Sequence, residues 1–371
     1  MYPEIRFYLF FLFVLSGLPA HLQITVPFDS PSWEIGGNFH QLTVYQGQQA
    51  ITLDGAVAKL KGVQFQDGII EWDMALSPQR GFAGLRFRTT DDTNGEEFYL
   101  RPHQSGKPDA NQYCPVNNGL ASWQLYHGEA YAAAIEYPFH EWFHVKLVIV
   151  GSSAEVYIKD MEKPLFHIPN LKQTPNTGGL ALYANRTPVY FANFSYTAMD
   201  NNPPKLTHPP MESSSASANI IKQWDISQAF AESKLEGLVN LEQWDTSMDW
   251  KPLEAEASGL TNIARITHFQ KETANTVFVR YKINATHKHT KALQLGFSDR
   301  ARVFFNGQLM FFGNDGFRTR DYRYLGTIGY HDTVYLPLEK GENELWIAVS
   351  ESFGGWAVQG RWLNLQGLIA Q

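Results

Sequence analysis

Cysteine and charge are both scarce in this sequence. Cys114 is the one cysteine among 371 residues, so no internal disulfide can form and the fold must rest on buried apolar side chains. Charged residues make up only 18% of the chain, against about 25% in ordinary globular proteins. The formal net charge is -7 and no block of basic residues occurs. The electrostatic footprint of a nucleic-acid-binding protein is therefore missing, and no nucleic-acid partner is predicted.

Several familiar motifs are absent as well. The sequence holds neither the G-x-S-x-G pattern of serine hydrolases nor a phosphate-binding G-x-x-x-x-G-K-[ST] loop. The apolar run from Phe7 to Leu18 falls short of the roughly 20 residues that span a bilayer. Arg6 precedes this run and a small residue, Ala20, follows it, so residues 1–20 are predicted to be a signal peptide. We expect a secreted or periplasmic protein with no membrane span.

One segment differs in composition from the rest of the chain. Residues 200–219 contain four prolines and four serines and almost no large apolar side chain, which is typical of a linker. The predicted organisation is a signal peptide at 1–20, a first domain at 22–198, a linker at 199–219 and a second domain at 220–371.

Both halves show the alternation of β-strands. Ile70, Trp72 and Met74 alternate with Glu71 and Asp73, and turn residues separate further runs of this kind. In the second half, Asn306-Gly307 predicts a two-residue hairpin turn. The predicted fold class is all-β, with two β-sandwich (jelly-roll) domains.

The order of these runs carries a family likeness. In the first half the elements are Phe65-x-Asp67-Gly68-x-Ile70-x-Trp72, Gly81–Arg88, Glu141–Leu147, Ala154–Ile158, Gly178–Leu182 and Val189–Phe194. They resemble the concanavalin A-like jelly-roll superfamily, which includes laminin-G-type modules, legume-type lectins and β-glucanases, and its branch associated with 3-keto-disaccharide hydrolysis. Ala301–Gly307 and Leu338–Leu345 resemble the galactose-binding-like sandwiches that accompany glycoside hydrolases. These resemblances imply carbohydrate as the ligand.

Two sequence motifs resemble catalytic motifs, but neither meets the structural requirements of the corresponding chemistry. His140-Glu141-Trp142-Phe143-His144 matches the zinc-protease pattern H-E-x-x-H, which needs a helix, whereas the residues that follow it predict a strand. Glu71-Trp72-Asp73 is similar to the start of the laminarinase-type motif Glu-x-Asp-x-x-Glu, but Leu76 stands at the second glutamate. Because that chemistry needs a pair of carboxylates, its mechanism does not carry over. No metal or other cofactor is predicted, although a structural calcium ion that the sequence does not locate stays open.

The strongest candidate site runs from Glu97 to His127. Glu97, Tyr99, Arg101 and His103 are expected on one face of a strand, and a polar loop follows them. The predicted ligand-binding residues, which mix hydrogen-bonding groups with aromatic faces, are Arg86, Arg88, Arg101, His103, Gln112, Tyr113, Trp123 and His127. The catalytic candidates are Glu97, His103 and Asp109. A solvated loop fixed by its own side chains is the alternative.

Two functions remain open on the sequence alone. One is a carbohydrate-binding protein that acts in polysaccharide recognition or utilisation. The other is a glycan-cleaving enzyme, such as a glycoside hydrolase of the 3-keto-disaccharide type, with its site in the first domain. In the second half, the loops Asp315–Tyr324 and Ser352–Trp356 are further candidate glycan contacts.

Overall fold

The computed structural model describes residues 22–173, 177–199, 203–208, 217–242, 244 and 247–369. The predicted signal peptide at 1–20 and much of the predicted linker lie outside these residues. In the described part, the helices are short 3-10 segments, η1 (Pro102–Gln104), η2 (Glu232–Leu235) and η3 (Ile263–Arg265). None of them has the length and apolar character needed to cross a membrane. The all-β fold class is thereby confirmed.

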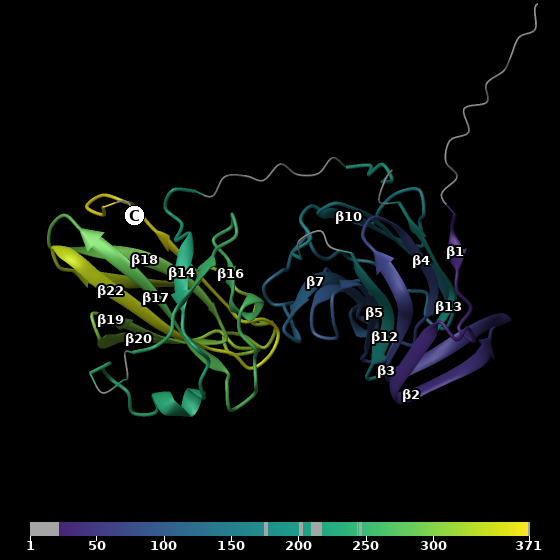
Figure 1. Cartoon of the computed structure of the whole chain (residues 1–371), viewed down its shortest axis with the longest axis horizontal. Coiled ribbons are helices and arrows are strands. Elements are labelled where there is room, and N and C mark those ends of the chain that lie inside the picture. The colour runs from purple at the N-terminus through teal and green to yellow at the C-terminus, as the bar shows by residue number, and fades with distance from the viewer. Residues whose placement is uncertain are drawn as a thin grey trace, which may run out of the picture.

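Thirteen strands in the N-terminal half form one antiparallel sheet, at the right in Figure 1. Its main path is β11-β10-β9-β4-β13-β3-β12-β5-β6-β7-β8, with β1 beside β13 and β2 beside β3. The strands are β1 (Ile24–Thr25), β2 (Trp33–Tyr45), β3 (Gln48–Phe65), β4 (Gly68–Ala75), β5 (Phe82–Thr89), β6 (Gly95–Leu100), β7 (Asn111–Asn117), β8 (Leu120–Ala121), β9 (Trp142–Val150), β10 (Ser153–Ile158), β11 (Phe166–Ile168), β12 (Gly178–Asn185) and β13 (Val189–Ala198).

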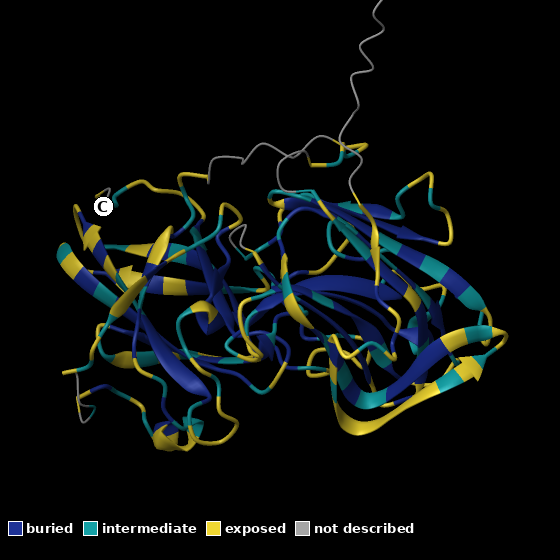
Figure 2. Ribbon diagram, turned by 45° about the vertical axis from the view of Figure 1, so that its right-hand side comes forward, coloured by how far each residue is buried: buried dark blue, intermediate teal, exposed yellow. Residues whose placement is uncertain are grey.

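The long strand β3 makes this sheet curl into a sandwich. Its first part pairs with β13 and its second part with β12, and Gly55 between them has a left-handed φ of 56°. The sheet can therefore fold over on itself and enclose a core that includes Trp72, Phe87, Phe98 and Phe191. This curled antiparallel arrangement resembles a jelly roll, and Figure 2 shows the buried strands inside it.

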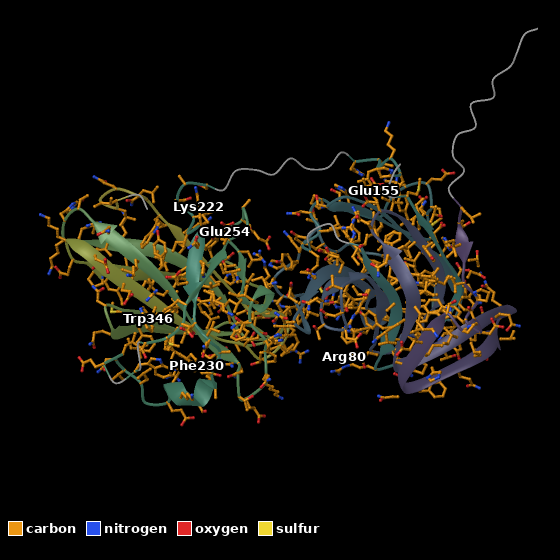
Figure 3. The ribbon with its side chains drawn as sticks, in the orientation of Figure 1. Arg80, Glu155, Lys222, Phe230, Glu254 and Trp346 are labelled. Atoms are coloured by element: carbon orange, nitrogen blue, oxygen red, sulfur yellow. The ribbon has the colours of Figure 1, made fainter. Side chains whose placement is uncertain are left out.

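The C-terminal half contains two smaller antiparallel sheets, β15-β14-β17-β22-β19-β20 and β16-β23-β18-β21. The strands are β14 (Gln223–Ile226), β15 (Lys251–Glu254), β16 (Thr261–Asn262), β17 (Thr276–Ala285), β18 (His289–Ser298), β19 (Arg300–Phe305), β20 (Gln308–Asn314), β21 (Asp332–Leu338), β22 (Gly341–Ser350) and β23 (Ala357–Trp362). Side chains of both sheets share one core, which includes Trp224, Leu295 and Ile347. A second apolar cluster contains Phe230 and Trp346, which Figure 3 labels.

The hairpin predicted at Asn306-Gly307 is present between β19 and β20. Both residues have positive φ values, 46° and 79°, as a two-residue turn of this type requires. Thr207 and His208, which belong to the predicted linker, instead hydrogen-bond to Glu155 on β10, a residue labelled in Figure 3. Thr207 and His208 are therefore anchored on the N-terminal half, whereas Asn219, at the end of the predicted linker, hydrogen-bonds to Trp362 in the C-terminal half.

The two halves are joined by contacts as well as by the chain. Leu120 of β8 packs within the core of the C-terminal half. Gln124 donates its backbone N–H to the Gly354 carbonyl at 2.8 Å and its side-chain Nε2–H to the Leu325 carbonyl at 2.7 Å. A Cβ atom at Gly354 would lie 2.3 Å from Oε1 of Gln124, so only glycine allows this approach.

Candidate functional site

A cavity of about 580 Å³ lies at the junction of the two halves. Most of its wall comes from the segments that follow β6 and β8. The residues with polar or aromatic side chains that line it from the N-terminal half are Arg101, Asp109, Gln112, Trp123, His127, Glu129 and Phe166, and the C-terminal half adds Leu325 and Thr327. Five predicted site residues, Arg101, Asp109, Gln112, Trp123 and His127, thus line one cavity.

Arg101 is the centre of this wall. It follows β6 directly, and the alternation along the strand puts it on the face of Tyr99, to whose hydroxyl it donates a 2.5 Å hydrogen bond from Nη2. Nη2 also donates to Oε1 of Gln112, and Nη1 donates to the Asp109 carbonyl at 3.1 Å. The guanidinium group lies 4.7 Å from the ring centre of Tyr99 and 5.7 Å from that of Trp123.

Gln112, which contacts Arg101, connects this wall to the segment that carries Trp123. Its Nε2 donates to the carbonyl oxygens of Trp123 and Tyr126 at 2.7 and 2.6 Å. The segment that carries the partly exposed Trp123 is therefore tied to β7. The ring of Trp123 also lies 6.2 Å from that of Phe353 in the C-terminal half. These contacts hold an aromatic face in place beside hydrogen-bonding groups.

The remaining predicted residues lie outside this cavity. Glu97 is buried and accepts a 2.8 Å hydrogen bond from Nε of Arg86, so these two residues form an ion pair on the outer face of the sheet. His103, in η1, packs edge-on against Phe82, and its buried Nδ1 has no hydrogen-bond partner among the described residues. Burial lowers the pKa of His103, and the nearby positive charge of Arg80 lowers it further. No hydrogen bond or ion pair joins the catalytic candidates Glu97, His103 and Asp109 within the described chain.

Arg88 and Tyr113 lie inside the fold, contrary to the surface role predicted for them. Arg88 is 1% exposed, and its Nη2 is 2.9 Å from Oδ1 of Asp67. Tyr113 is fully buried and donates its hydroxyl to Glu96 at 2.7 Å. Tyr113 belongs to a strand rather than to the loop expected there, because β7 begins at Asn111. Neither side chain is available to a ligand from outside.

Sequence reasoning named the loops Asp315–Tyr324 and Ser352–Trp356 of the C-terminal half as candidate glycan contacts, but it did not include Leu325 or Thr327. Leu325 and Thr327 reach the cavity because the segment around them packs on residues 124–128, where the Ile328 N–H donates to the Gln124 carbonyl at 3.0 Å. The exposed His127 has its Nε2 atom 3.1 Å from the Ile328 carbonyl. Nothing in the sequence signals this contact between segments two hundred residues apart.

The two motifs that were set aside meet on the outer face of the sheet. β4 pairs with β9, so Asp73 lies opposite His144. Nδ1 of His144 is 2.6 Å from Oδ1 of Asp73, and its Nε2 is 3.4 Å from Oε1 of Glu71. The strand predicted after His140 is confirmed. Both ring nitrogens of His144 face carboxylates, so the protonated imidazole is stabilised and bridges them.

The protonation of His144 makes the free energy of unfolding depend on pH in the alkaline range. Hydrogen bonds to Asp73 and then Glu71 raise its pKa from 6.5 to about 9. Since the folded-state pKa exceeds the unfolded one, this contribution is complete below about pH 6.5 and is lost as the pH rises through about 9. The side chain is 34% exposed, so solvent screening reduces the expected effect to roughly 1–2 kcal/mol. Urea unfolding at pH 6.5 and 9.5 should show a loss of stability that is larger in the native protein than in His144→Gln by this amount; an equal loss in both would contradict it.

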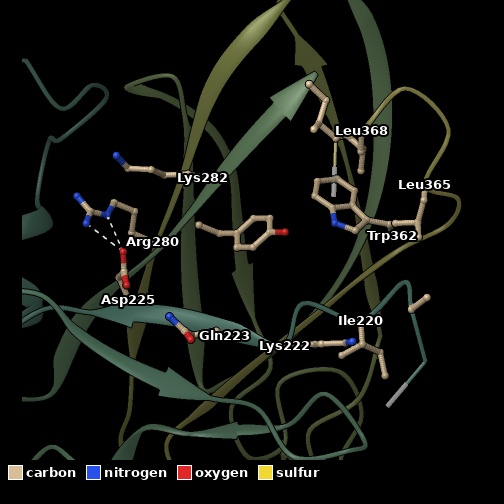
Figure 4. Close-up of a pocket in the computed structure, with 12 residues that line it drawn as sticks. Ile220, Lys222, Gln223, Asp225, Arg280, Lys282, Trp362, Leu365 and Leu368 are labelled. Atoms are coloured by element: carbon tan, nitrogen blue, oxygen red, sulfur yellow. Dashed lines mark hydrogen bonds and ion pairs between the residues drawn. The ribbon is translucent and has the colours of Figure 1, made fainter. Parts of the chain in front are cut away.

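A second, larger cavity of about 810 Å³ lies in the C-terminal half. Figure 4 shows Lys222, Asp225, Arg280 and Lys282 around it, with Trp362 and Leu368 on the apolar side. Its arginine is already neutralised, because Arg280 is 3.0 Å from Asp225 and 3.7 Å from Glu344. At the smaller cavity, by contrast, Arg101 forms no ion pair with any described residue, so its charge is the less well compensated of the two.

Comparisons with known proteins give likenesses of fold. No protein-family model matches the chain, and no curated protein matches its sequence. Among solved structures, it is similar to the carbohydrate-binding module CBM66 from Bacillus subtilis, with 18% identity over 45% of this chain and 96% of that one and a TM-score of 0.35. A β-glucanase from Bacillus licheniformis shares 13% identity over 47% of this chain and 97% of its own, with a TM-score of 0.35. The galectin LEC-6 from Caenorhabditis elegans shares 12% identity over 44% and 99%, with a TM-score of 0.28. At such low identity a shared ligand does not follow.

Proposed function

We propose that this chain is a carbohydrate-binding protein and that the cavity at the junction of its halves is the binding site. The observation that carries the proposal is the set of side chains around that cavity. Trp123 offers an aromatic face, and Arg101, Asp109 and Gln112 offer donors and acceptors beside it. Sugars present alternating C–H faces and hydroxyl groups, which need this combination, and ligand sites in general place a few polar groups within an apolar pocket.

The site is also preorganised. Arg101 and Gln112 are 6% and 4% exposed, and each is held by hydrogen bonds to its neighbours. Side chains that are fixed before binding lose little conformational entropy when a ligand arrives. The predicted signal peptide supports an exported protein, and we extend the proposal to binding of polysaccharide outside the cytoplasm.

One observation favours glycan cleavage as a second candidate function. Asp109 and Glu129 both line the cavity, and glycosidases use two carboxylates on either side of the bond that is broken. Release of reducing ends from bound glycans, lost in Asp109→Asn, would show this activity. Binding without such release leaves the first proposal standing alone.

Binding is tested by screening the mature protein on a glycan array and then measuring affinity for the best ligand by calorimetry. Trp123→Ala should weaken binding about 30-fold or more, because a central aromatic contact is worth about 2 kcal/mol. Tyr335→Ala is the matched control, since Tyr335 is 65% exposed on β21 and is not part of the cavity wall. Folding of each variant is checked by circular dichroism. Unchanged affinity in a folded Trp123→Ala protein would contradict the proposed site.

A further inference from the structure

The charge of Arg101 is buried, and in the part of the chain that the structure describes no opposite charge forms an ion pair with it. A guanidinium group has five N–H donors, and the structure gives Arg101 three hydrogen bonds, so two N–H groups have no acceptor among the described residues. The three acceptors are a backbone carbonyl, a phenol and a side-chain amide. All three are neutral, and none of them balances the positive charge.

Arg88 shows how the charge of a buried arginine is compensated elsewhere in this fold. Arg88 and Arg101 are the two buried arginines in the described part of the chain. Arg88 has the carboxylate of Asp67 at 2.9 Å, whereas no carboxylate of the described residues lies within ion-pair distance of Arg101. A charge removed from water costs several kcal/mol unless an opposite charge or strong hydrogen bonds compensate it. The position of Arg101 therefore carries a cost that the protein alone does not offset fully.

A ligand in the cavity can compensate the charge of Arg101. Arg101 lies in its wall with the rings of Tyr99 and Trp123 at 4.7 and 5.7 Å, so the cation is stabilised on its aromatic side while the cavity stays open to a ligand. Asp109 and Glu129 line the cavity too, yet neither forms an ion pair with Arg101 in the described structure. Their oxygens remain available to accept hydrogen bonds from sugar hydroxyls.

We infer that the saccharide bound here carries an anionic group, and that Arg101 recognises it. This inference rests on the proposed function and adds the class of ligand, an acidic glycan. A uronate carboxylate and a sulfate ester share the chemistry that matters, a negative charge with several acceptor oxygens. Bound beside Arg101, the group supplies the missing counter-charge and accepts the remaining N–H bonds.

The experiment compares glycans that differ only in charge. Oligosaccharides of polygalacturonate, alginate and oxidised cellulose are assayed by calorimetry beside the same oligosaccharides after reduction of their carboxyl groups to alcohols. A sulfated galactan and its desulfated form make a further pair. At least one acidic member should bind about 10-fold to 100-fold more tightly than its neutral partner, the range expected for a hydrogen bond between charged groups. The pair that shows the preference distinguishes carboxylate from sulfate.

Variants assign the preference to Arg101. Arg101→Gln should abolish it, and Arg101→Lys, which keeps the charge, should retain part of it. Arg280→Gln is the matched control, because Arg280 lines the other cavity and is already paired with Asp225. Equal binding of acidic and neutral partners would overturn the inference and leave carbohydrate binding intact. Absence of binding to any glycan, on these pairs and on the array, would overturn both.

Discussion

Replacing Arg88 with methionine is expected to lower the free energy of unfolding by roughly 3–5 kcal/mol, the usual cost of removing one partner from a buried ion pair. The guanidinium of Arg88 donates to Asp67 at 2.9 Å and to the Gln66 carbonyl at 2.8 Å, and its side chain has no measurable exposure. Burial lowers the pKa of Arg88, and the charge of Asp67 opposes that shift. Methionine fills the space but leaves the buried carboxylate without its cation.

The change is measured by chemical denaturation at neutral pH. Lys59→Met is the matched control, because Lys59 pairs with Asp92 on the surface at 2.6 Å and the two side chains are 42% and 77% exposed. Loss of that pair should cost about 1 kcal/mol or less. Adding Asp67→Asn to Arg88→Met should recover part of the loss. A cost for Arg88→Met no greater than that of the control would contradict this account.

A fall in stability between about pH 4.5 and 7 is the second large effect expected, and it comes from Glu96. This side chain is fully buried and accepts hydrogen bonds from the Tyr113 hydroxyl at 2.7 Å and from the Gln173 N–H at 2.9 Å. Burial raises its pKa from 4.5 to about 7, although the Tyr113 hydrogen bond acts in the opposite direction. The folded protein therefore holds a proton that the unfolded chain releases, and stability is lost as the pH rises through this range. The expected loss is about 3 kcal/mol.

Glu96→Gln tests this origin, because glutamine keeps an acceptor for Tyr113 and cannot ionise. Urea denaturation at pH 5, 6, 7 and 8 should give a flatter profile for the variant than for the native protein. Burial also raises the pKa values of Asp299, Asp315 and Glu351, which act in the same direction, so some slope should remain. A variant with the full native slope would place the effect on those residues instead.

The strands were predictable because burial on one face imposes a period of two. In β4, Ile70, Trp72 and Met74 are fully buried while Glu71 and Asp73 are partly exposed, as their alternation indicates. The same rule placed Tyr99 and Arg101 on one face, and their hydrogen bond confirms it. Local patterns of this kind need no knowledge of distant segments.

Arg88 shows where the rule fails. The alternation from Leu85 puts Arg86 and Arg88 on the same outer face. In the structure, however, the register between β12 and β5 shifts after Gly179 and Arg88 adopts a left-handed φ of 50°. An irregularity of this kind redirects the side chain, here to the interior beside Asp67. Gly178 and Gly179 of β12 lie at the shift, but they do not identify Arg88 as the residue whose side chain turns inward.

Only part of the candidate site could be predicted from the sequence, because the rest depends on contacts between distant segments. Arg101, Gln112 and Trp123 are close in sequence, and their polar and aromatic character indicated a ligand site. The wall formed by Leu325 and Thr327 depends on tertiary packing between segments far apart in the chain, which no local pattern encodes. The pairing of β4 with β9, which joins Asp73 to His144, is unpredictable in the same way.

Leu120 packs in the core of the C-terminal half, and Gln124 contacts Gly354. These two contacts limit how the halves of the protein can be separated or exchanged. If the chain were divided near residue 199 and the halves were separated, the N-terminal half would expose Leu120 to water. The C-terminal half would lose this apolar side chain from its core. Grafting the N-terminal half onto a different partner would also remove Leu325 and Thr327 from the cavity wall. Exchanging either half for another domain would therefore change the pocket along with the junction.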